Sequence, residues 1–271
     1  MITASVVLYN TPKEEINNVL GSLENSSVDL IYVIDHSADD MARPVVEQFK
    51  KVRYERHANA GYGTGHNHGI QQALASGSKY HAVINPDVFW GEDVIKSLAD
   101  FMDSNPDCGL VMPRVLFPNG DIQYLCKLLP TPMDLIGRRF IPLKGYTERH
   151  NFYYEMRWSG YDKVMDIPCL SGCFMFMRCD VLRQTGGFDE RFFLYAEDID
   201  LCRRIGEKAR TLYYPKVSVY HAYRRESYKS LKFLRIHINS IIKYFNKWGW
   251  FVDHERERVN RRSLRLLHKS R

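Results

Sequence analysis

Four short clusters of residues have compositions that suit chemistry, and the first of them is rich in glycine. The run NAGYGTGHNHG spans residues 59–69 and follows a β-like segment. Glycines let the backbone approach a ligand closely, and the N-terminus of a helix that follows them can bind phosphate. The spacing is not that of the dinucleotide-binding fingerprint. Taken alone, the run is explained equally well as a glycine-rich turn that binds nothing.

The second cluster is Asn85-Pro86-Asp87, at the end of another β-like segment. A carboxylate at the carboxyl end of a strand suits Mg²⁺ or Mn²⁺, and such an ion also bridges a diphosphate. The amide oxygen of Asn85 would support the ion or bind a donor. By itself, however, the tripeptide is more simply explained as the start of a turn.

The third cluster is acidic and stands at the start of a predicted helix. It reads Glu197-Asp198-Ile199-Asp200 and is followed by Arg203 and Arg204. The helix dipole favours acids at this position, and Asp200 can pair with an arginine three or four residues further on. This structural role does not explain the adjacent Glu197 and Asp198, where a carboxylate can take a proton from a hydroxyl.

The fourth cluster begins with His221, at the end of a further β-like segment, and continues with Arg224, Arg225 and Ser227. A single histidine is more often structural than a ligand. On these residues alone, contact of His221 with a metal or a diphosphate is therefore the less favoured hypothesis.

The elements that position these clusters alternate between strands and helices over the first hundred residues. The predicted strands are 2–9, 30–35, 52–57 and 79–88, and the predicted helices are 13–23, 44–51, 66–77 and 92–103. In the first helix, the apolar residues Ile16, Val19, Leu20 and Leu23 have helical spacing. The alternation predicts a mostly parallel sheet with helices on both faces, and such sheets bind ligands beyond the carboxyl ends of their strands.

The pattern changes after residue 105. A hairpin is predicted around Pro118-Asn119-Gly120, and residues 127–163 show no clear period and are interpreted as a mobile or acceptor-facing segment. The remaining predictions are a strand (167–178), a turn (183–193), a helix start (196–205), a strand pair broken at Pro215 (211–221), an amphipathic helix (230–248) and a helical tail. We divide the chain into a domain over 1–225, with halves 1–105 and 106–225, and an extension over 226–271.

Composition narrows the class of protein. The 271 residues are 45% hydrophobic and 26% charged, as expected for a folded chain, and no apolar run approaches the ~18 residues of a membrane-spanning helix. The N-terminus lacks the basic region of a signal peptide, so a cytoplasmic location is expected.

Six cysteines without a C-x-x-C pair are expected to be reduced and mostly buried, which makes zinc unlikely in this sequence. The net charge of residues 222–271 is +10 and that of residues 1–221 is −4, which predicts an anionic partner for the C-terminal segment.

Taken together, seven fragments make the chain similar to the family 2 nucleotide-sugar glycosyltransferases, which have the GT-A fold. In chain order they are SVVLYN, VIDHSADD, NAGYGTGHNHGI, INPDV, SGCFMFMR, GGFDERFFLYAEDIDLCRR and VYHAYRRES. The resemblance runs from residue 2 to about residue 225. Within the family, the chain looks most like the rhamnosyltransferase-like branch.

The resemblance implies an inverting transfer of rhamnose or a similar hexose from a dTDP- or UDP-linked donor to a saccharide or lipid-linked acceptor, in cell-surface polysaccharide synthesis. Asp198 matches the catalytic base, and Asp87 and His221 match residues that hold Mg²⁺ or Mn²⁺ or reach the diphosphate. Asn85 stands where many relatives have Asp, and the stretch after His221 lacks the family's glycine. The residues expected to bind the nucleotide or donor sugar are Leu8, Tyr9, Asn10, Asp35, Asn59, Gly61, Asn67, Asn85 and Asp87. Gly172 and Glu197 are expected near the acceptor.

Two alternatives stay open on the sequence. A nucleotidyltransferase of similar fold usually has a glycine-rich, basic loop after its first strand, and the loop here is Tyr9-Asn10-Thr11-Pro12. A non-catalytic protein would use the basic tail beyond Asp253 to bind an anionic membrane surface, with helix 230–248 either on the membrane or packed on the domain. For the packed case, the inward residues would be Leu231, Leu234, Ile238, Ile241 and Ile242. Nucleic acid is not expected, because the tail lacks an ordered aromatic and basic pattern.

Overall fold

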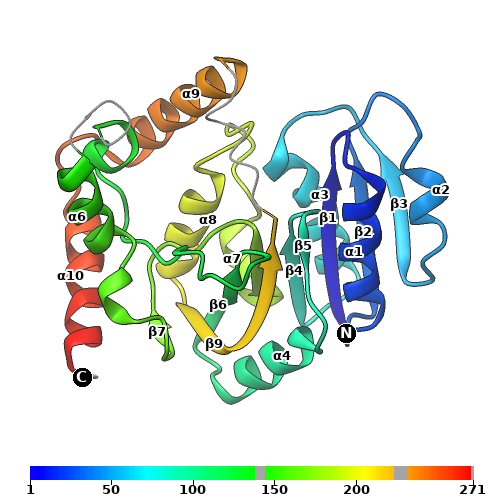
Figure 1. Cartoon of the computed structure of the whole chain (residues 1–271), viewed down its shortest axis with the longest axis horizontal. Coiled ribbons are helices and arrows are strands. Elements are labelled where there is room, and N and C mark those ends of the chain that lie inside the picture. Colours follow the sequence, from blue (N-terminus) through cyan, green and yellow to red (C-terminus); the bar gives the residue numbers. More distant parts are fainter. Residues whose placement is uncertain (138–143, 223–230, 270–271) are drawn as a thin grey trace.

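The computed structural model describes residues 1–137, 144–222 and 231–269, and within them one mixed sheet of nine strands connects the two halves of the chain (Figure 1). The strands are β1 (Ile2–Leu8), β2 (Leu30–Asp35), β3 (Val52–Arg56), β4 (Tyr80–Ile84), β5 (Val88–Phe89), β6 (Cys108–Leu116), β7 (Met165–Asp166), β8 (Phe174–Arg178) and β9 (Arg210–His221). Their order is β3-β2-β1-β4-β8-β6-β9-β5, and β7 pairs with β9.

The first half is the parallel part of this sheet. Strands β3, β2, β1 and β4 are parallel neighbours, so their carboxyl ends lie at one edge. The helices between them are α1 (Lys13–Glu24), α2 (Arg43–Val46) and α3 (Tyr62–Ala75), and α4 (Val94–Ser104) follows β5. The predicted alternation is confirmed, and the four apolar residues chosen for the first helix are all buried. Helix α2 is shorter than predicted, and α3 begins four residues earlier, at Tyr62.

Side chains that alternate along β1 place helices on both of its faces. Ala4, Val6 and Leu8 join the main hydrophobic core together with the buried residues of α1. On the other face, Gly65 and Gly69 let α3 lie directly against Val7 and Ser5, because a Cβ at either glycine would approach those side chains within 2.8 Å. Helices α1 and α3 therefore cover the two faces of β1, whose carboxyl end lies at the edge where the sequence predicts ligand binding.

The second half of the chain forms the partly antiparallel part of the sheet, and most differences between the predicted and the observed elements lie there. Strand β8 lies antiparallel between β4 and β6, and β9 is a single strand rather than a broken pair. Between Tyr214 and Ser218 of β9, the paired residues of β6 advance by only one position. Pro215 therefore lies in a bulge, where its missing N–H is tolerated. The turn at Gly120 is present, but the second arm of the predicted hairpin is reduced to a bridge between Leu116 and Ile122.

The helices of this half are α6 (Lys144–Tyr154), α7 (Cys179–Thr185), α8 (Glu197–Gly206), α9 (Leu231–Trp248) and α10 (His254–Lys269), with short helical turns over Met133–Gly137 and Arg157–Ser159. The sequence did not predict α6, whose apolar residues follow no helical period, or α7, which overlaps the predicted turn. In Figure 1, α6, α9 and α10 lie at the opposite end of the molecule from β3 and α2. All six cysteines are buried free thiols.

Helix α9 does not pack as the sequence suggested. Ile241 is buried as expected, but Leu231 is 75% exposed and Ile238 and Ile242 are each 40% exposed. The residues that α9 buries are Ser240, Ile241, Tyr244 and Phe245. The apolar side chains of α9 therefore share one broad face: one edge of it packs on the domain, and the other edge, with Leu231, Ile238 and Ile242, is exposed.

Candidate active site

The pairing of β4 with β8 brings two of the sequence clusters together. In this antiparallel ladder Ile84 lies opposite Phe174, so the end of β4 meets the start of β8. The next residues along are Asn85 on one side and Cys173 on the other, and the Asn85 N–H donates to the Cys173 carbonyl at 2.9 Å. The Asn85–Asp87 segment therefore lies beside the Gly172–Cys173 turn at the carboxyl edge of the parallel strands.

The same turn holds the start of α8. The Gly172 N–H donates to Oδ2 of Asp198 at 2.9 Å, and the Tyr62 hydroxyl donates to the Gly172 carbonyl at 2.7 Å. A Cβ at Gly172 would lie 3.2 Å from the Cβ of Asp198, so a residue without a side chain permits this close approach. Gly172 thus links the first turn of α3 to the partly exposed carboxylate of Asp198.

The phenol of Tyr62 lies close to acidic residues from more than one of the sequence clusters. Burial raises the pKa of its phenol well above the usual value. Four acidic groups around the phenol raise it further: Glu197, Cys173, Asp198 and Asp87. Residues from the ends of β4 and β8 and from the start of α8 are therefore within electrostatic reach of each other.

Asp87 and His221 face each other because β5 pairs with the end of β9. Val88 lies opposite His221 in that ladder, and Nε2 of His221 lies 3.3 Å from Oδ1 of Asp87. Gln123 holds the histidine from behind, with its Oε1 at 3.0 Å from Nδ1 and its amide donating to the His221 carbonyl at 2.7 Å. Burial lowers the pKa of His221, but neighbouring Cys173 and Asp87 outweigh burial and raise it to about 10.

These residues offer a pair of ligands rather than a complete metal cage. Among the described residues, no group of three or more His, Cys, Asp or Glu side chains could hold a metal ion. Asp87 and His221 form the pair, and the buried Oδ1 of Asn85 beside them has no hydrogen-bond partner. A divalent ion fits such a site when a diphosphate supplies its other oxygens. Arg224 and Arg225 lie outside the described residues.

The two adjacent acids of α8 have different environments. Glu197 is only 5% exposed, and its Oε2 has no hydrogen-bond partner within the described chain. Burial, and then the charge of Asp198, raise the pKa of Glu197 well above its usual value, which favours the neutral form of this acid. Asp198 is the acid of this pair that can accept a proton.

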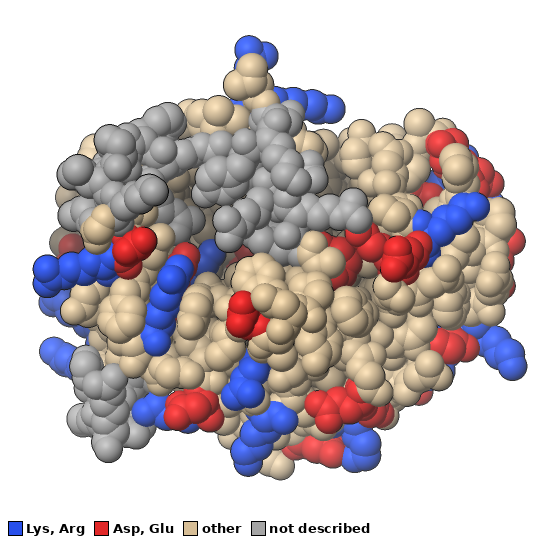
Figure 2. Space-filling model, viewed as in Figure 1, with Lys and Arg blue, Asp and Glu red and all other residues tan. Residues whose placement is uncertain are grey.

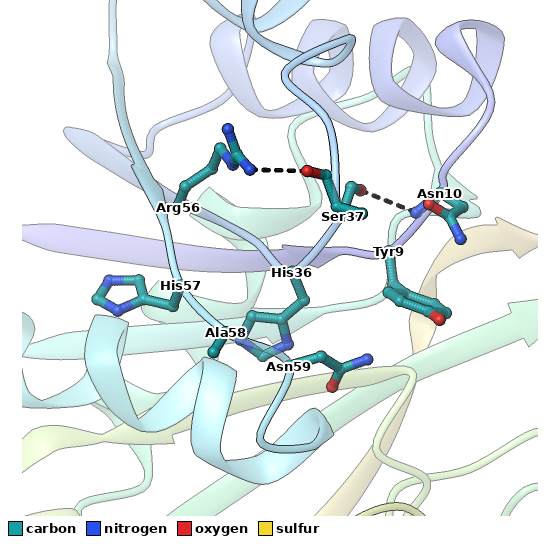
Figure 3. Close-up of a pocket in the computed structure, with 9 residues that line it drawn as sticks. Tyr9, Asn10, His36, Ser37, Arg56, His57, Ala58 and Asn59 are labelled. Carbon is teal, nitrogen blue, oxygen red and sulfur yellow. Dashed lines mark hydrogen bonds between the residues drawn. The ribbon is translucent and has the colours of Figure 1, made fainter.

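A polar cleft of about 580 Å³ lies at the ends of the neighbouring strands β1, β2 and β3 (Figure 3). Its walls are Tyr9, Asn10, His36, Ser37, Ala38, Arg56, His57, Ala58 and Asn59. The Asn10 N–H donates to the Ser37 hydroxyl at 2.9 Å, and the Arg56 guanidinium donates to the Ala38 carbonyl at 2.9 Å. These contacts fix the three loops against each other around a planar aromatic side chain, Tyr9, which is half exposed.

Three of the residues expected to bind the nucleotide or donor have other partners. Leu8 is 1% exposed and belongs to the hydrophobic core. Asp35 is fully buried, and its two oxygens accept hydrogen bonds from the Ser37 N–H and the Tyr54 hydroxyl. Asn67 is also buried, and its amide bonds both the N–H and the carbonyl of Phe188. Asp35 and Asn67 therefore position loops, and neither lines the cleft.

Gly61 lies at the junction of the cleft with the second half. Its φ is +113°, and a Cβ there would lie 2.4 Å from the Phe193 carbonyl oxygen, to which the Tyr62 N–H donates. Asn59 accepts a hydrogen bond from the Gly61 N–H and lines the cleft, as do Tyr9 and Asn10.

Sequence reasoning missed several residues at the ends of strands that line the cleft. His36 and Ser37 follow β2, and Arg56 and His57 stand at the end of β3. The rule that ligands bind beyond strand ends could have found them, because it applies to every residue of such a loop. Gln123 and Cys173 had no comparable indication, since only long-range pairing brings them to His221.

Comparisons with known proteins agree with this geometry. The model of the family described as "Glycosyl transferase family 2" matches residues 3–186. The chain is 29% identical to the N-acetylglucosaminyl-diphospho-decaprenol L-rhamnosyltransferase of Mycobacterium tuberculosis, over 80% of this chain and 74% of that protein. It is 24% identical to the rhamnosyltransferase WbbL of Escherichia coli, over 82% of this chain and 85% of that protein.

Solved structures share the fold. The mannosyltransferase PcManGT of Pyrobaculum calidifontis, in complex with GDP-Man and Mn²⁺, aligns with a TM-score of 0.57 at 16% identity. The alignment covers 89% of this chain and 64% of the mannosyltransferase chain, so this chain spans less than two thirds of that structure. The central sheet with its flanking helices is thus of the GT-A type. No helix among the described residues is long and apolar enough to cross a membrane.

Proposed function

Because the chain belongs to glycosyl transferase family 2, we propose that it is an inverting, rhamnosyltransferase-like enzyme. Its donor is a dTDP- or UDP-linked sugar, rhamnose or a similar hexose, and its acceptor is a hydroxyl of a saccharide or lipid-linked saccharide in cell-surface polysaccharide synthesis. Two rhamnosyltransferases among the curated relatives support this choice of donor sugar. Family membership favours sugar transfer over both alternatives considered from the sequence.

The observation that carries the proposal is the meeting of three parts at one sheet edge. The cleft at the ends of β1, β2 and β3 offers a polar, aromatic site of the size of a nucleoside. Asp87 lies after the next parallel strand, and Asp198 reaches the same edge through its hydrogen bond with Gly172. A nucleotide in the cleft can therefore extend its diphosphate toward Asp87 and its sugar toward Asp198.

In the proposed reaction, Asp198 accepts the proton of the acceptor hydroxyl while that oxygen attacks the anomeric carbon. The bond from this carbon to the diphosphate oxygen breaks, and its electron pair leaves with the nucleoside diphosphate. Attack on the side opposite to the leaving group inverts the configuration. An alcohol is a far weaker acid than a carboxylic acid, so the proton moves late, after bond formation has acidified the hydroxyl.

Asp87, together with His221 after loss of the proton that it carries beside Asp87, would hold a divalent cation, Mn²⁺ or Mg²⁺, next to the diphosphate. When bound, such an ion stabilises the negative charge of the departing diphosphate. The unpartnered Oδ1 of Asn85 supplies a further oxygen on the same side. The solved relative that contains both GDP-Man and Mn²⁺ supports this assignment.

The assignment of the base is tested by two substitutions of adjacent residues. Asp198→Asn removes the proton acceptor, and we expect transfer to fall by about 10²–10⁴-fold while calorimetry shows unchanged binding of the nucleoside diphosphate. Glu197→Gln is the matched control, because Glu197 is buried and Gln keeps its size without its carboxylate, and it should keep transfer within a few fold. Near-normal turnover of Asp198→Asn would rule out this residue as the base. A screen of dTDP-rhamnose and UDP-hexoses as donors then identifies the sugar.

We propose in addition that the C-terminal helices contact an anionic membrane surface from the cytoplasmic side. Leu231, Ile238 and Ile242 fall on one outer face of α9, since their spacings of seven and four residues return to the same side of a helix. Phe251 and Val252, in the connection to α10, are 83% and 72% exposed. Lys and Arg side chains lie over α9 and α10 on the face that Figure 2 shows, and they suit contact with anionic lipid.

Vesicle sedimentation of the full chain tests this contact. We expect binding to vesicles that contain phosphatidylglycerol and little binding to neutral phosphatidylcholine vesicles. A double substitution, Ile238→Ser with Ile242→Ser, should weaken binding several fold. Met41→Ser is the control, because Met41 is 64% exposed and belongs to the segment before α2, at the other end of the molecule. Equal binding of both variants would contradict the proposed contact.

A further inference from the structure

The turn that leads into the proposed base has an unfavourable backbone conformation. Tyr195 and Ala196 have φ angles of 71° and 67°, so two successive residues with side chains are in the left-handed region. This conformation is unfavourable for any residue except glycine, and it persists only where the surroundings hold it. Glu197 and Asp198 follow at once, so whatever holds this turn also sets the direction of the Asp198 carboxylate.

Helix α9 holds the turn from the outside. The hydroxyl of Ser240, which is 1% exposed, donates to the Leu194 carbonyl at 2.8 Å. The ring of His237 meets the ring of Tyr195 edge-on, with 5.0 Å between ring centroids. Ala196 is buried in a separate apolar cluster with Ile241, Tyr244 and Phe245 of α9. Each residue of the turn from Leu194 to Ala196 therefore has a partner on α9.

A second anchor lies on the far side of α8 from the site. Asp200 follows Asp198 by two residues, which is about 200° around a helix, so the two carboxylates project to nearly opposite sides. Asp200 is fully buried, and its Oδ1 accepts a hydrogen bond from Nε1 of Trp248 at 2.8 Å and forms an ion pair with Nζ of Lys247 at 2.6 Å. Its Oδ2 accepts from Arg204 at 2.8 Å. The end of α9 thus fixes the rotation of α8 about its axis.

A third contact ties α8 to the start of α10. Arg203 and Asp253 form a two-fold hydrogen-bonded ion pair at 2.6 and 2.7 Å, and both side chains are almost fully buried. The guanidinium of Arg203 also lies 4.1 Å from the ring centroid of Trp248. Buried, paired charges of this kind are costly to separate, so this pair joins α8 to the segment that begins α10.

We infer that α9 is a positioning element for sugar transfer, in which Ser240 and Trp248 act through the Leu194–Ala196 turn and Asp200 to hold Asp198 against the Gly172 N–H. Neither residue touches the nucleotide cleft, whose described walls all lie between residues 9 and 59. The C-terminal helices are thus part of the catalytic half. This inference rests on the proposed role of Asp198 as the base.

The test separates positioning from general stability. Trp248→Phe and Ser240→Ala each remove one donor, and Trp250→Phe is the control, because the Trp250 indole donates to Asn246 of α9 itself at 2.8 Å. We expect kcat of the first two variants to fall between tenfold and a hundredfold, since small displacements of a reacting group have effects of this size. The donor KM and the calorimetric affinity for the nucleoside diphosphate should stay within twofold of the wild type.

The outcomes are distinct. A kcat for both variants equal to that of Trp250→Phe overturns the inference. So does a parallel loss of nucleotide affinity and thermal stability, because α9 would then support the whole fold rather than Asp198. If Asp198→Asn is inactive while Trp248→Phe and Ser240→Ala match the control, the proposed function stands and only the positioning role fails. If Asp198→Asn keeps its turnover, both fail.

Discussion

The two parts of the site are built from different lengths of the chain. In the cleft, all the loops belong to residues 9–59, and the contact that joins the Asn10 N–H to the Ser37 hydroxyl spans 27 residues. At the proposed catalytic carboxylate, Asp198 meets Gly172 across 26 residues and Gly172 meets Tyr62 across 110 residues. The cleft is therefore shaped within the first sixty residues, whereas the position of Asp198 depends on packing between both halves of the chain.

This difference indicates how each part should respond to change. The cleft is a set of short loops on rigid parallel strands, so substitutions there should alter affinity and leave the rest of the molecule intact. The proposed catalytic part has a strained turn, a close glycine contact and a buried carboxylate on α8. Small changes there should therefore alter the rate of sugar transfer. Four substitutions test this contrast, from the largest expected effect to the smallest.

Asp87→Ala acts where the two parts meet, and it should have the largest effect. Loss of this carboxylate removes the principal candidate ligand for the cation, and we expect transfer to fall by about 10³-fold. In calorimetry, Mn²⁺ should strengthen nucleoside diphosphate binding to the wild type but not to the variant. An equal gain from Mn²⁺ in both proteins would show that the ion binds elsewhere.

Gly61→Ala tests the contact between the cleft and the second half. The added Cβ meets the Phe193 carbonyl at 2.4 Å in a backbone conformation reserved for glycine, and we expect the free energy of unfolding to fall by about 3 kcal/mol. Gly77→Ala is the control, since Gly77 also has a positive φ but nothing lies within 4 Å of its Cβ position. It should cost about 1 kcal/mol in urea titrations. Equal costs would contradict a tight contact at Gly61.

His81→Gln tests the interior of the parallel half through its pH dependence. His81 is fully buried between the hydroxyls of Thr3 and Ser5, and burial lowers its pKa from 6.5 to about 3. Below pH 6.5 the unfolded chain binds a proton that the folded chain refuses, so stability falls as the pH falls toward 3. Between pH 6.5 and pH 5 this histidine should account for about 2 kcal/mol of that loss.

The measurement is urea unfolding of the wild type and the variant at both pH values. His81→Gln should lose about 2 kcal/mol less than the wild type over this interval. His254→Gln, a substitution of an exposed histidine at the start of α10, should follow the wild type. An unchanged pH dependence in His81→Gln would mean that other groups are responsible.

Tyr9→Ala should have the smallest effect. Tyr9 is half exposed at the edge of the cleft, where its ring can stack on the nucleobase of the donor. We therefore expect nucleotide affinity to fall by about 1 kcal/mol. The value of kcat at saturating donor should not change, because Tyr9 touches neither Asp87 nor Asp198 in the structure. A loss confined to kcat would mean that Tyr9 acts on the transfer step rather than on nucleotide binding, and would contradict the roles given to the two parts.

The same contrast explains what could be predicted from the sequence. The strands of the parallel half, the inward face of α1 and the position of Asn59 at a strand-end loop follow from local patterns. Asp35 shows the limit of such patterns, because they do not reveal that this strand-end acid is buried and fixes its own loop. Only its partners, Ser37 and Tyr54, reveal this.

In the catalytic part, the sequence identified Glu197 and Asp198 but not their different states. Their separation into a buried acid with a raised pKa and a partly exposed carboxylate depends on tertiary burial, which no spacing encodes. The outward face of α9 was misassigned for a related reason. Helix α9 has one broad apolar face, and the pattern alone does not tell which edge of that face Ser240 will fix against Leu194.

A crystal structure with UDP or dTDP and Mn²⁺ bound tests the central claim most directly. We expect the nucleobase beside Tyr9 and Ser37. The diphosphate and the ion should lie next to Asp87 and His221, with the terminal phosphate facing Asp198. A nucleotide bound instead in a different cavity, such as the one between Leu129 and Asn260, would contradict the account, as would a bound diphosphate remote from Asp87.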